Sequence, residues 1–226
     1  MTTDAALYRL LTWLSPGYPL GAFAYSHGLE QAVEAGLVRD ADGAKRYVAT
    51  VLRAGSGRSD AALFAAAYRA ASDDDAAELR ALAELAAAWR ATYETALEAD
   101  AQGRAFLSVT RRAWPHPLLD AAAESPSPPS LPVVVAIAAA AHGVPLAQAL
   151  LAYLHSLAAN LVSAGIRLVP LGQTDAQRIL AALEPDIAAA RDSGLTIPLD
   201  AVGASAAIVE RCSVLHETQY TRLFRS

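Results

Sequence analysis

The stretch PLAQALLAYLHSLAANL, residues 145–161, indicates the fold class most clearly. Its leucines recur at the three- and four-residue spacing that lines one face of an α-helix: Leu150, Leu151, Leu154, Leu157 and Leu161. Pro145 suits the first helical turn, where its missing amide proton leaves no hydrogen bond unmade. His155 lies among the leucines, so we expect it in the core. The stretch predicts a long helix packed on its leucine face.

The composition extends this pattern to the whole chain. Hydrophobic residues make up 54% of the 226 residues, and about a quarter of all residues are alanine, the best helix former. Helical periodicity recurs almost throughout, whereas the alternation typical of strands is nearly missing. We therefore predict an all-α fold in which residues 1–226 form a single globular domain, a helical bundle of nine or ten helices.

One proline- and serine-rich stretch interrupts the helical pattern at residues 114–132. Proline lacks an amide proton and clashes with the preceding turn, so helices do not run through such a stretch. The helices on both sides have open apolar faces that need a common partner. We interpret the stretch as a long connection within one domain, although its composition also fits a domain boundary.

Two helix starts can be predicted from capping residues. Ser72 precedes the run Asp73–Asp75, whose charge suits the positive end of a helix dipole. Thr174 and Gln177 have the Thr-x-x-Gln spacing of a capping box. We expect helices to begin directly after Ser72 and Thr174.

Charge and cysteine content exclude several classes of protein. With 18 basic and 23 acidic residues the net charge is −5, which argues against a nucleic-acid partner. The apolar run Leu131–Ala141 is shorter than the roughly 20 residues that a membrane-spanning helix needs, and the N-terminus lacks a signal-peptide pattern. The single cysteine, Cys212, cannot form an internal disulfide. We expect a cytoplasmic protein without a membrane partner.

Catalytic motifs are missing from the sequence. No phosphate-binding G-x-x-x-x-G-K-[ST] pattern surrounds the sole lysine, Lys45, and no G-x-S-x-G elbow surrounds Ser26. Cys212 and His216 are four residues apart on one helix face, a usable spacing for two metal ligands. Two ligands do not complete a site, so this pair is a weak metal candidate, and a packed thiol with a capping histidine is the alternative. We predict that the chain is not an enzyme.

The N-terminal stretch SPGYPLGAFAYSHGLE, residues 15–30, combines prolines, glycines, aromatic residues and a histidine. Such a loop serves as a catalytic loop, a ligand-binding loop or a docking surface. One hypothesis is therefore a ligand-binding protein or helical enzyme with a pocket around Tyr25, His27 and Glu30. The other is a rigid loop that presents a surface to another protein.

The C-terminal tail, residues 217–226, ends in a short amphipathic segment. Tyr220, Leu223 and Phe224 are spaced to share one helix face, and Arg222 and Arg225 stand beside them. One turn of helix cannot hold itself together in water. The tail therefore either folds back on its own domain or becomes ordered when its apolar residues and arginines meet a partner.

Three ordered stretches resemble the urease accessory protein UreF family: LLTWLSPGYPLGAFAYSHGLEQAVEAGLV, PLGQTDAQRIL and HETQYTRLFRS. The resemblance implies a non-enzymatic, all-α homodimer that joins UreD (UreH) to the GTPase UreG. That complex docks on apo-urease and supports nickel insertion into the urease metallocentre. The chain itself would bind no cofactor firmly, because nickel and GTP enter through the partner proteins.

The resemblance also implies which residues bind partners. In the loop they are Tyr25, His27 and Glu30, although family members vary at the position of His27. The internal stretch contributes Gln173 and Arg178. The tail is expected to engage UreD and to support recruitment of UreG through Tyr220, Arg222, Leu223, Phe224 and Arg225.

Overall fold

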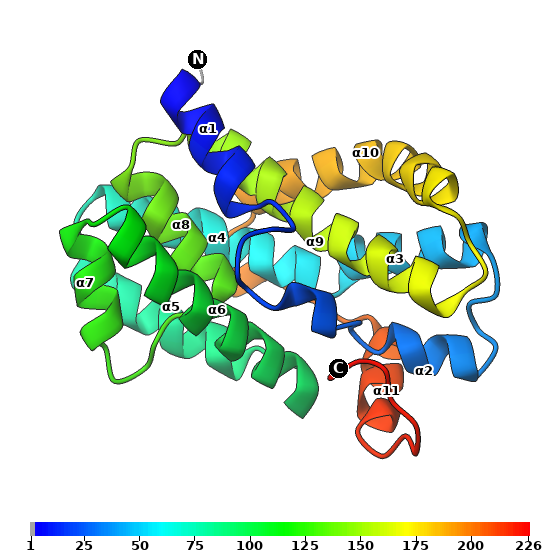
Figure 1. Cartoon of the computed structure of the whole chain (residues 1–226). Helices are drawn as coiled ribbons and strands as arrows, with labels where there is room; N and C mark the ends of the chain where they lie inside the picture. Colours follow the sequence, from blue (N-terminus) through cyan, green and yellow to red (C-terminus); the bar gives the residue numbers. More distant parts are fainter. Residues whose placement is uncertain (1–2) are drawn as a thin grey trace.

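The computed structural model describes residues 3–226, and its regular structure there is entirely helical (Figure 1). The α-helices are α1 (Asp4–Trp13), α2 (Leu29–Glu34), α3 (Ala41–Ala54), α4 (Ser56–Ser72), α5 (Ala76–Ala88), α6 (Tyr93–Ala113), α7 (Pro117–Glu124), α8 (Leu131–Ala141), α9 (Leu146–Leu168), α10 (Gln173–Thr196) and α11 (Ala207–His216). Two 3-10 helices are η1 (Ala22–Ala24) and η2 (Leu199–Ala201). The prediction of a single all-α domain is confirmed.

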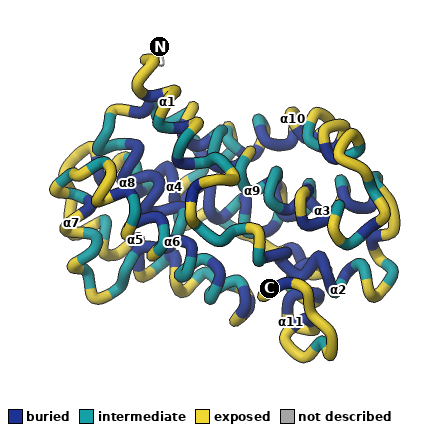
Figure 2. Tube along the Cα trace, viewed as in Figure 1, coloured by how far each residue is buried: buried dark blue, intermediate teal, exposed yellow. Residues whose placement is uncertain are grey.

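Helix α4 forms the centre of the bundle. It packs against α3, α5, α8, α9 and α10, and α8 is buried along nearly its whole length (Figure 2). Small side chains allow these helices to approach closely. A Cβ atom at Gly194 of α10 would lie 2.5 Å from the Cβ of Ala61 in α4, so glycine is required at this crossing.

Helix α9 is the long helix predicted from residues 145–161. Its leucine face is buried as expected, with Leu150, Leu154 and Leu161 fully inaccessible. His155 is exposed, and its prediction as a core residue is wrong, because it projects from the opposite face. By length and composition alone α9 could cross a membrane, but half of its most apolar window is buried in the bundle, as in the core helix of a globular domain.

The connection at residues 114–132 contains a helix that the sequence analysis did not predict. Pro117 occupies the first turn of α7, where proline favours helix initiation. The Nδ1 atom of His116 accepts a hydrogen bond from the Leu118 amide at 3.2 Å. The proline that interrupts one helix therefore begins the next, and α7 packs against α6 and α8.

Both predicted helix caps are wrong by a few residues. Ser72 ends α4, and the carboxylate of Asp75 caps α5 by accepting the amides of Ala77 and Glu78 at 3.1 and 3.0 Å. Helix α10 begins at Gln173, so Thr174 lies within its first turn. The carboxylate of Asp175 accepts the Gly172 amide at 3.1 Å. In both cases a nearby aspartate, a stronger acceptor than a hydroxyl, fixes the helix start.

Candidate functional site

The chain's two most distinctive segments meet on one side of the bundle. The C-terminal tail leaves α11, turns back and lies against the loop that precedes α2 (Figure 1). Backbone hydrogen bonds join the two segments: the Ser26 amide donates to the Ser226 carbonyl at 2.8 Å, and the Arg225 amide donates to the Ala24 carbonyl at 2.7 Å. The Ser26 hydroxyl also donates to the Ser226 carbonyl. The tail therefore folds back on its own domain.

The loop reaches the tail through an unusual backbone turn. His27 and Gly28 both have positive φ angles, 54° and 73°. A Cβ atom at Gly28 would lie 2.5 Å from the Ser213 nitrogen, so glycine allows α11 to pack directly on the start of α2. The left-handed conformation is unfavourable for histidine, and a 2.7 Å hydrogen bond from the Tyr47 hydroxyl to the His27 carbonyl helps to hold it.

Glu30, in the first turn of α2, anchors the tail backbone. Its carboxylate accepts the amides of Leu223 at 2.6 Å and Phe224 at 2.9 Å. Only 7% of the residue is exposed. A buried carboxylate must be hydrogen-bonded to remain charged, and the tail amides supply these bonds.

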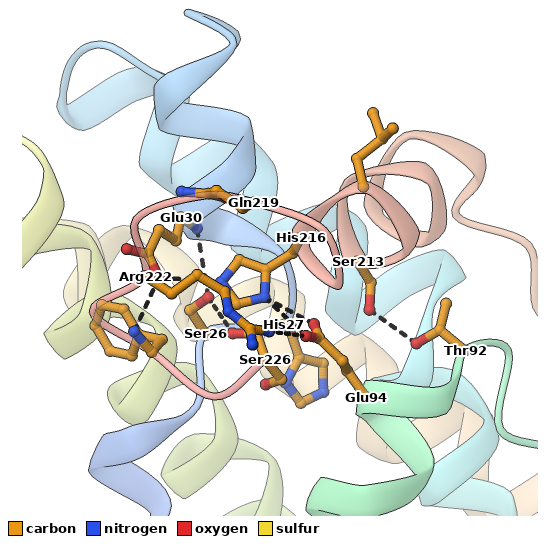
Figure 3. Close-up of polar contacts among 12 residues, drawn as sticks. Ser26, His27, Glu30, Thr92, Glu94, Ser213, His216, Gln219, Arg222 and Ser226 are labelled. Atoms are coloured by element: carbon orange, nitrogen blue, oxygen red, sulfur yellow. Dashed lines mark hydrogen bonds and ion pairs between the residues drawn. The ribbon is translucent and has the colours of Figure 1, made fainter.

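A second buried carboxylate, Glu94 at the start of α6, binds a tail side chain. Its Oε1 lies 3.0 Å from the Arg222 guanidinium, and its Oε2 lies 2.8 Å from Nδ1 of His216 (Figure 3). Burial raises the pKa of Glu94, whereas the hydrogen bond and charge of His216 and the charge of Arg222 lower it. The other ring nitrogen of His216, Nε2, lies 3.0 Å from Glu30. His216 thus bridges the two carboxylates that hold the tail.

Glu98, one turn further along α6, binds the end of the tail. Its Oε2 accepts the Ser226 hydroxyl at 3.0 Å and lies 3.0 Å from Nδ1 of His27. Burial lowers the pKa of His27, but the charge and contact of Glu98, with the charge of Asp60, outweigh it and raise the pKa overall. The tail's last residue is therefore held beside a histidine whose protonated form is favoured.

The inner and outer sides of the tail differ in character. Phe224 is 3% exposed, and the Arg167 guanidinium lies 4.3 Å from its ring centroid, a cation–π contact. The Arg225 guanidinium lies 5.8 Å from the Tyr25 ring. Tyr220 is fully exposed and Leu223 is 63% exposed. The docked tail therefore buries one aromatic residue and presents two apolar side chains outward.

Large apolar side chains are exposed at two ends of the molecule. One group lies on α1: Leu7, Tyr8 and Leu11. The other belongs to the tail, to α11 and to the start of α6: Tyr93, Val214, Leu215, Tyr220 and Leu223. Helices α1 and α11 lie at opposite ends of the structure (Figure 1). We call these groups the α1 surface and the tail surface.

The structure places the predicted loop residues inside the molecule. Tyr25, His27 and Glu30 are all buried, because the tail covers them, whereas Phe23 is 71% exposed. A small cavity borders His27 and is lined by apolar side chains together with Asp60, Arg90 and Glu98, but neither Tyr25 nor Glu30 lines it. These three residues therefore position the tail, and in this conformation they are not part of the exposed surface.

Other predicted residues lie elsewhere. Gln173 and Arg178 are exposed in the first turns of α10, where Arg178 forms an ion pair with Asp175 at 3.3 Å. Cys212 is buried, and burial raises the pKa of its thiol. Both ring nitrogens of His216 face carboxylates, so it does not converge with Cys212 on a shared ion. Within residues 3–226, no group of three or more His, Cys, Asp or Glu side chains is arranged so that it could hold a metal ion.

Glu94 and Glu98, which bind Arg222 and Ser226 of the tail, were not predicted as site residues. The signal was present, because Glu94, Glu98 and Gln102 recur every four residues along one face of α6. The Gln102 amide donates to Glu98 at 2.8 Å. A polar stripe of this kind is indistinguishable from a solvated helix face until its neighbours in space are known.

The structure is thus an all-α domain with exposed apolar side chains grouped on the α1 surface and the tail surface. The sequence profile of the UreF family matches residues 38–184. Over its full length the chain is 54% identical to the urease accessory protein UreF of Granulibacter bethesdensis, covering 96% of that relative. It is 52% identical to UreF of Bradyrhizobium sp. (strain ORS 278) and 50% identical to UreF of Rhodopseudomonas palustris (strain BisB18), covering 98% of this chain and 92% of each relative.

The chain belongs to the UreF family of urease accessory proteins. Its role therefore lies in urease maturation, and it is an accessory protein rather than an enzyme.

Proposed function

We propose that this chain bridges UreD (UreH) and the GTPase UreG on apo-urease and thereby supports nickel insertion into the urease metallocentre. It acts in the cytoplasm as a homodimer. It binds no cofactor firmly, since nickel and GTP are carried by its partners. The tail, with Tyr220, Arg222, Leu223 and Arg225 on its accessible side, is the element that engages UreD.

The single observation that best supports this proposal is the pair of exposed apolar surfaces at opposite ends of the molecule. A bridging protein needs two separate surfaces, because its partners must bind at the same time. Exposed apolar side chains grouped on a surface are typical of protein-binding sites. The tail exposes Tyr220, Arg222 and Leu223, and aromatic and arginine side chains dominate the energetics of many interfaces.

The proposal is tested by co-purifying the chain with UreD and UreG. The full-length chain is expected to form a defined complex, and a chain lacking Thr218–Ser226 is expected to lose UreD while remaining helical. Undiminished UreD binding by the folded, truncated chain would overturn the tail assignment. Failure of the folded full-length chain to bind either partner would overturn the bridging role itself.

Truncation also removes buried residues, so a second variant separates binding from docking. Tyr220→Ala with Leu223→Ala removes only outward side chains and keeps Phe224 in place. We expect this variant to weaken UreD binding by about 30-fold or more, since a tyrosine at the centre of an interface contributes about 2 kcal/mol or more. Leu37→Ala, at an exposed apolar residue outside both surfaces, is the matched control and should bind as the parent does.

A further inference from the structure

Residues 222–226 bind the domain as a non-helical segment in which alternate side chains face inward. The side chains that bind inward are Arg222, Phe224 and Ser226, and the exposed ones between them are Leu223 and Arg225. Main-chain groups are bound as well, because the Leu223 and Phe224 amides donate to Glu30 at 2.6 and 2.9 Å. Main-chain hydrogen bonds combined with enclosed alternate side chains are typical of the way domains recognise short peptides.

The groups that receive this segment come from the loop before α2, from α2, from α6 and from α9. We call them the tail cradle, and its members are Ala24, Ser26, Glu30, Glu94, Glu98 and Arg167. The Arg222 guanidinium lies 3.0 Å from Glu94 (Figure 3). The Arg167 guanidinium lies 4.3 Å from the centre of the Phe224 ring. The cradle therefore recognises an arginine and, two residues later, an aromatic side chain.

The cradle side chains are also held by partners that lie outside the tail. The ring nitrogens of His216 lie 2.8 Å from Glu94 and 3.0 Å from Glu30. The Arg167 guanidinium donates a hydrogen bond to the Phe23 carbonyl at 2.7 Å. A site already held in its binding geometry loses less conformational entropy when it binds. We therefore expect the cradle to keep its shape when the tail leaves it.

The segment between α11 and the bound residues has the contacts of a tether. Residues 217–221 are mostly exposed, and in the described part of the chain their hydrogen bonds reach only residues 215–221. The Gln219 side-chain amide, for example, donates to the Thr221 carbonyl at 3.0 Å. A flexible tether adds no contact of its own and acts by keeping the ligand near its site at a high effective concentration. Residues 222–226 are therefore bound by the cradle itself.

We propose that the tail cradle is a recognition site for peptides of the pattern Arg-x-Phe-x-Ser. The chain's own tail occupies the site in cis, and residues 222–226 of a second copy of this chain bind there in trans. The second copy carries the matching sequence, and the contacts that bind it do not involve the tether. The cradle contacts the inner side of the tail, so it is distinct from the outward residues Tyr220 and Leu223 of the tail surface.

The full-length variant Arg222→Ala with Phe224→Ala opens the cradle, and a peptide then tests it. The probe is QYTRLFRS, the sequence of residues 219–226, with a fluorophore at its N-terminus, and binding is followed by anisotropy. We expect saturable binding to the folded variant, and binding at least about tenfold weaker to the parent, whose own tail competes. Adding Glu30→Gln to the variant should weaken binding about tenfold or more, and adding Glu34→Gln should not.

The matched control peptide is QYTALARS, which lacks the arginine and the aromatic ring that the cradle contacts. We expect it to bind at least about tenfold more weakly than QYTRLFRS, since it loses a charged hydrogen bond and the buried ring. Equal binding of the two peptides, or no saturable binding of QYTRLFRS to the folded variant, would overturn the proposal.

The parent chain supplies a second measurement that does not depend on the variant. A peptide that occupies the cradle keeps the chain's own tail undocked, so hydrogen exchange at the Phe224 amide should accelerate. Unlabelled QYTRLFRS at its dissociation constant or above should accelerate it at least about twofold, and QYTALARS at the same concentration should not. Exchange that ignores QYTRLFRS would overturn the proposal. Neither experiment contains UreD or UreG, so its failure leaves the bridging role as it stands.

Discussion

Replacing Glu30 with glutamine should release the tail without unfolding the domain. The carboxylate accepts two tail amides, at 2.6 and 2.9 Å, and lies 3.0 Å from His216. Glutamine has nearly the same shape but offers one oxygen, and its NH₂ group would face a donor. The change therefore removes at least one hydrogen bond to a charged acceptor and weakens the rest.

The magnitude follows from these contacts. A hydrogen bond to a charged group contributes about 1.5–3 kcal/mol, so Glu30→Gln should destabilise the docked tail by about 2–4 kcal/mol. Since 1.4 kcal/mol corresponds to a tenfold change in an equilibrium constant, the undocked population should rise roughly 30-fold to 1,000-fold. The free energy of unfolding of the helical domain should change much less, because the tail lies outside the central packing around α4.

Limited digestion with trypsin measures this population. Cleavage after Arg222 requires the docked backbone to open, and when reclosing is fast the cleavage rate is proportional to the open fraction. We expect Glu30→Gln to accelerate this cleavage at least about 30-fold, as derived from the hydrogen-bond loss. Glu34→Gln changes the same chemistry on the exposed end of α2 and should leave the rate unchanged. A rate for Glu30→Gln equal to that of the control would refute the argument that Glu30 anchors the tail.

Three further predictions concern the domain that carries the tail. Gly194→Ala should lower the free energy of unfolding, measured by urea titration, by about 1–3 kcal/mol, because the added Cβ would meet Ala61. Gly203→Ala is the control and should leave this free energy unchanged, because nothing lies within 4 Å of its added Cβ. Equal free energies of unfolding for the two variants would contradict the close α4–α10 crossing. Arg90→Met should lower the free energy of unfolding by about 3–5 kcal/mol, because it leaves the buried carboxylate of Asp60 without its cation. Arg104→Met, which breaks the exposed ion pair with Asp100, should lower it by less than about 1 kcal/mol. Folding raises the pKa of His27 above its usual 6.5. The ion pair between His27 and Glu98 therefore stabilises the protein fully below pH 6.5, and this stabilisation is lost as the pH rises through the raised pKa. The stability difference between the parent and His27→Gln should therefore shrink with rising pH, and a constant difference would show that the pair does not titrate.

The fold class could be predicted because it depends on repeated local signals. The leucines of α9 recur at helical spacing over several turns, and their burial follows directly from that periodicity. Helix ends could not be predicted as well. Asp75 caps α5 in place of Ser72, and Asp175 binds the amide of Gly172 at the start of α10, so only the path of the chain decides which residue caps.

The site could be predicted only in part, because its residues are joined by contacts distant in sequence. Tyr25, His27, Glu30 and the tail stand out in the sequence by composition, but nothing local indicates that they bind each other. Glu94 is 128 residues from Arg222 and 122 residues from His216. A glutamate near the start of a helix normally faces water, where it favours the helix dipole, so burial of Glu94 could not be foreseen.

The pair Cys212 and His216 illustrates the same limit. Their spacing places both on one helix face, but partners from other elements determine what that face does. Glu30 and Glu94 occupy the two ring nitrogens of His216, and Cys212 packs in the core. The alternative of a packed thiol describes Cys212, and His216 is a bridge between carboxylates rather than a helix cap.

The effects predicted for Glu30→Gln require a tail that docks on its own domain before any partner binds. Hydrogen exchange of residues 222–226, measured on the chain alone and again in its complex with UreD, reports this docking. We predict that the Leu223, Phe224 and Arg225 amides exchange slowly in the free chain and more slowly still in the complex. Exchange in the free chain at the rate of an unstructured peptide would contradict the claim, and would show that the tail becomes ordered only on its partner.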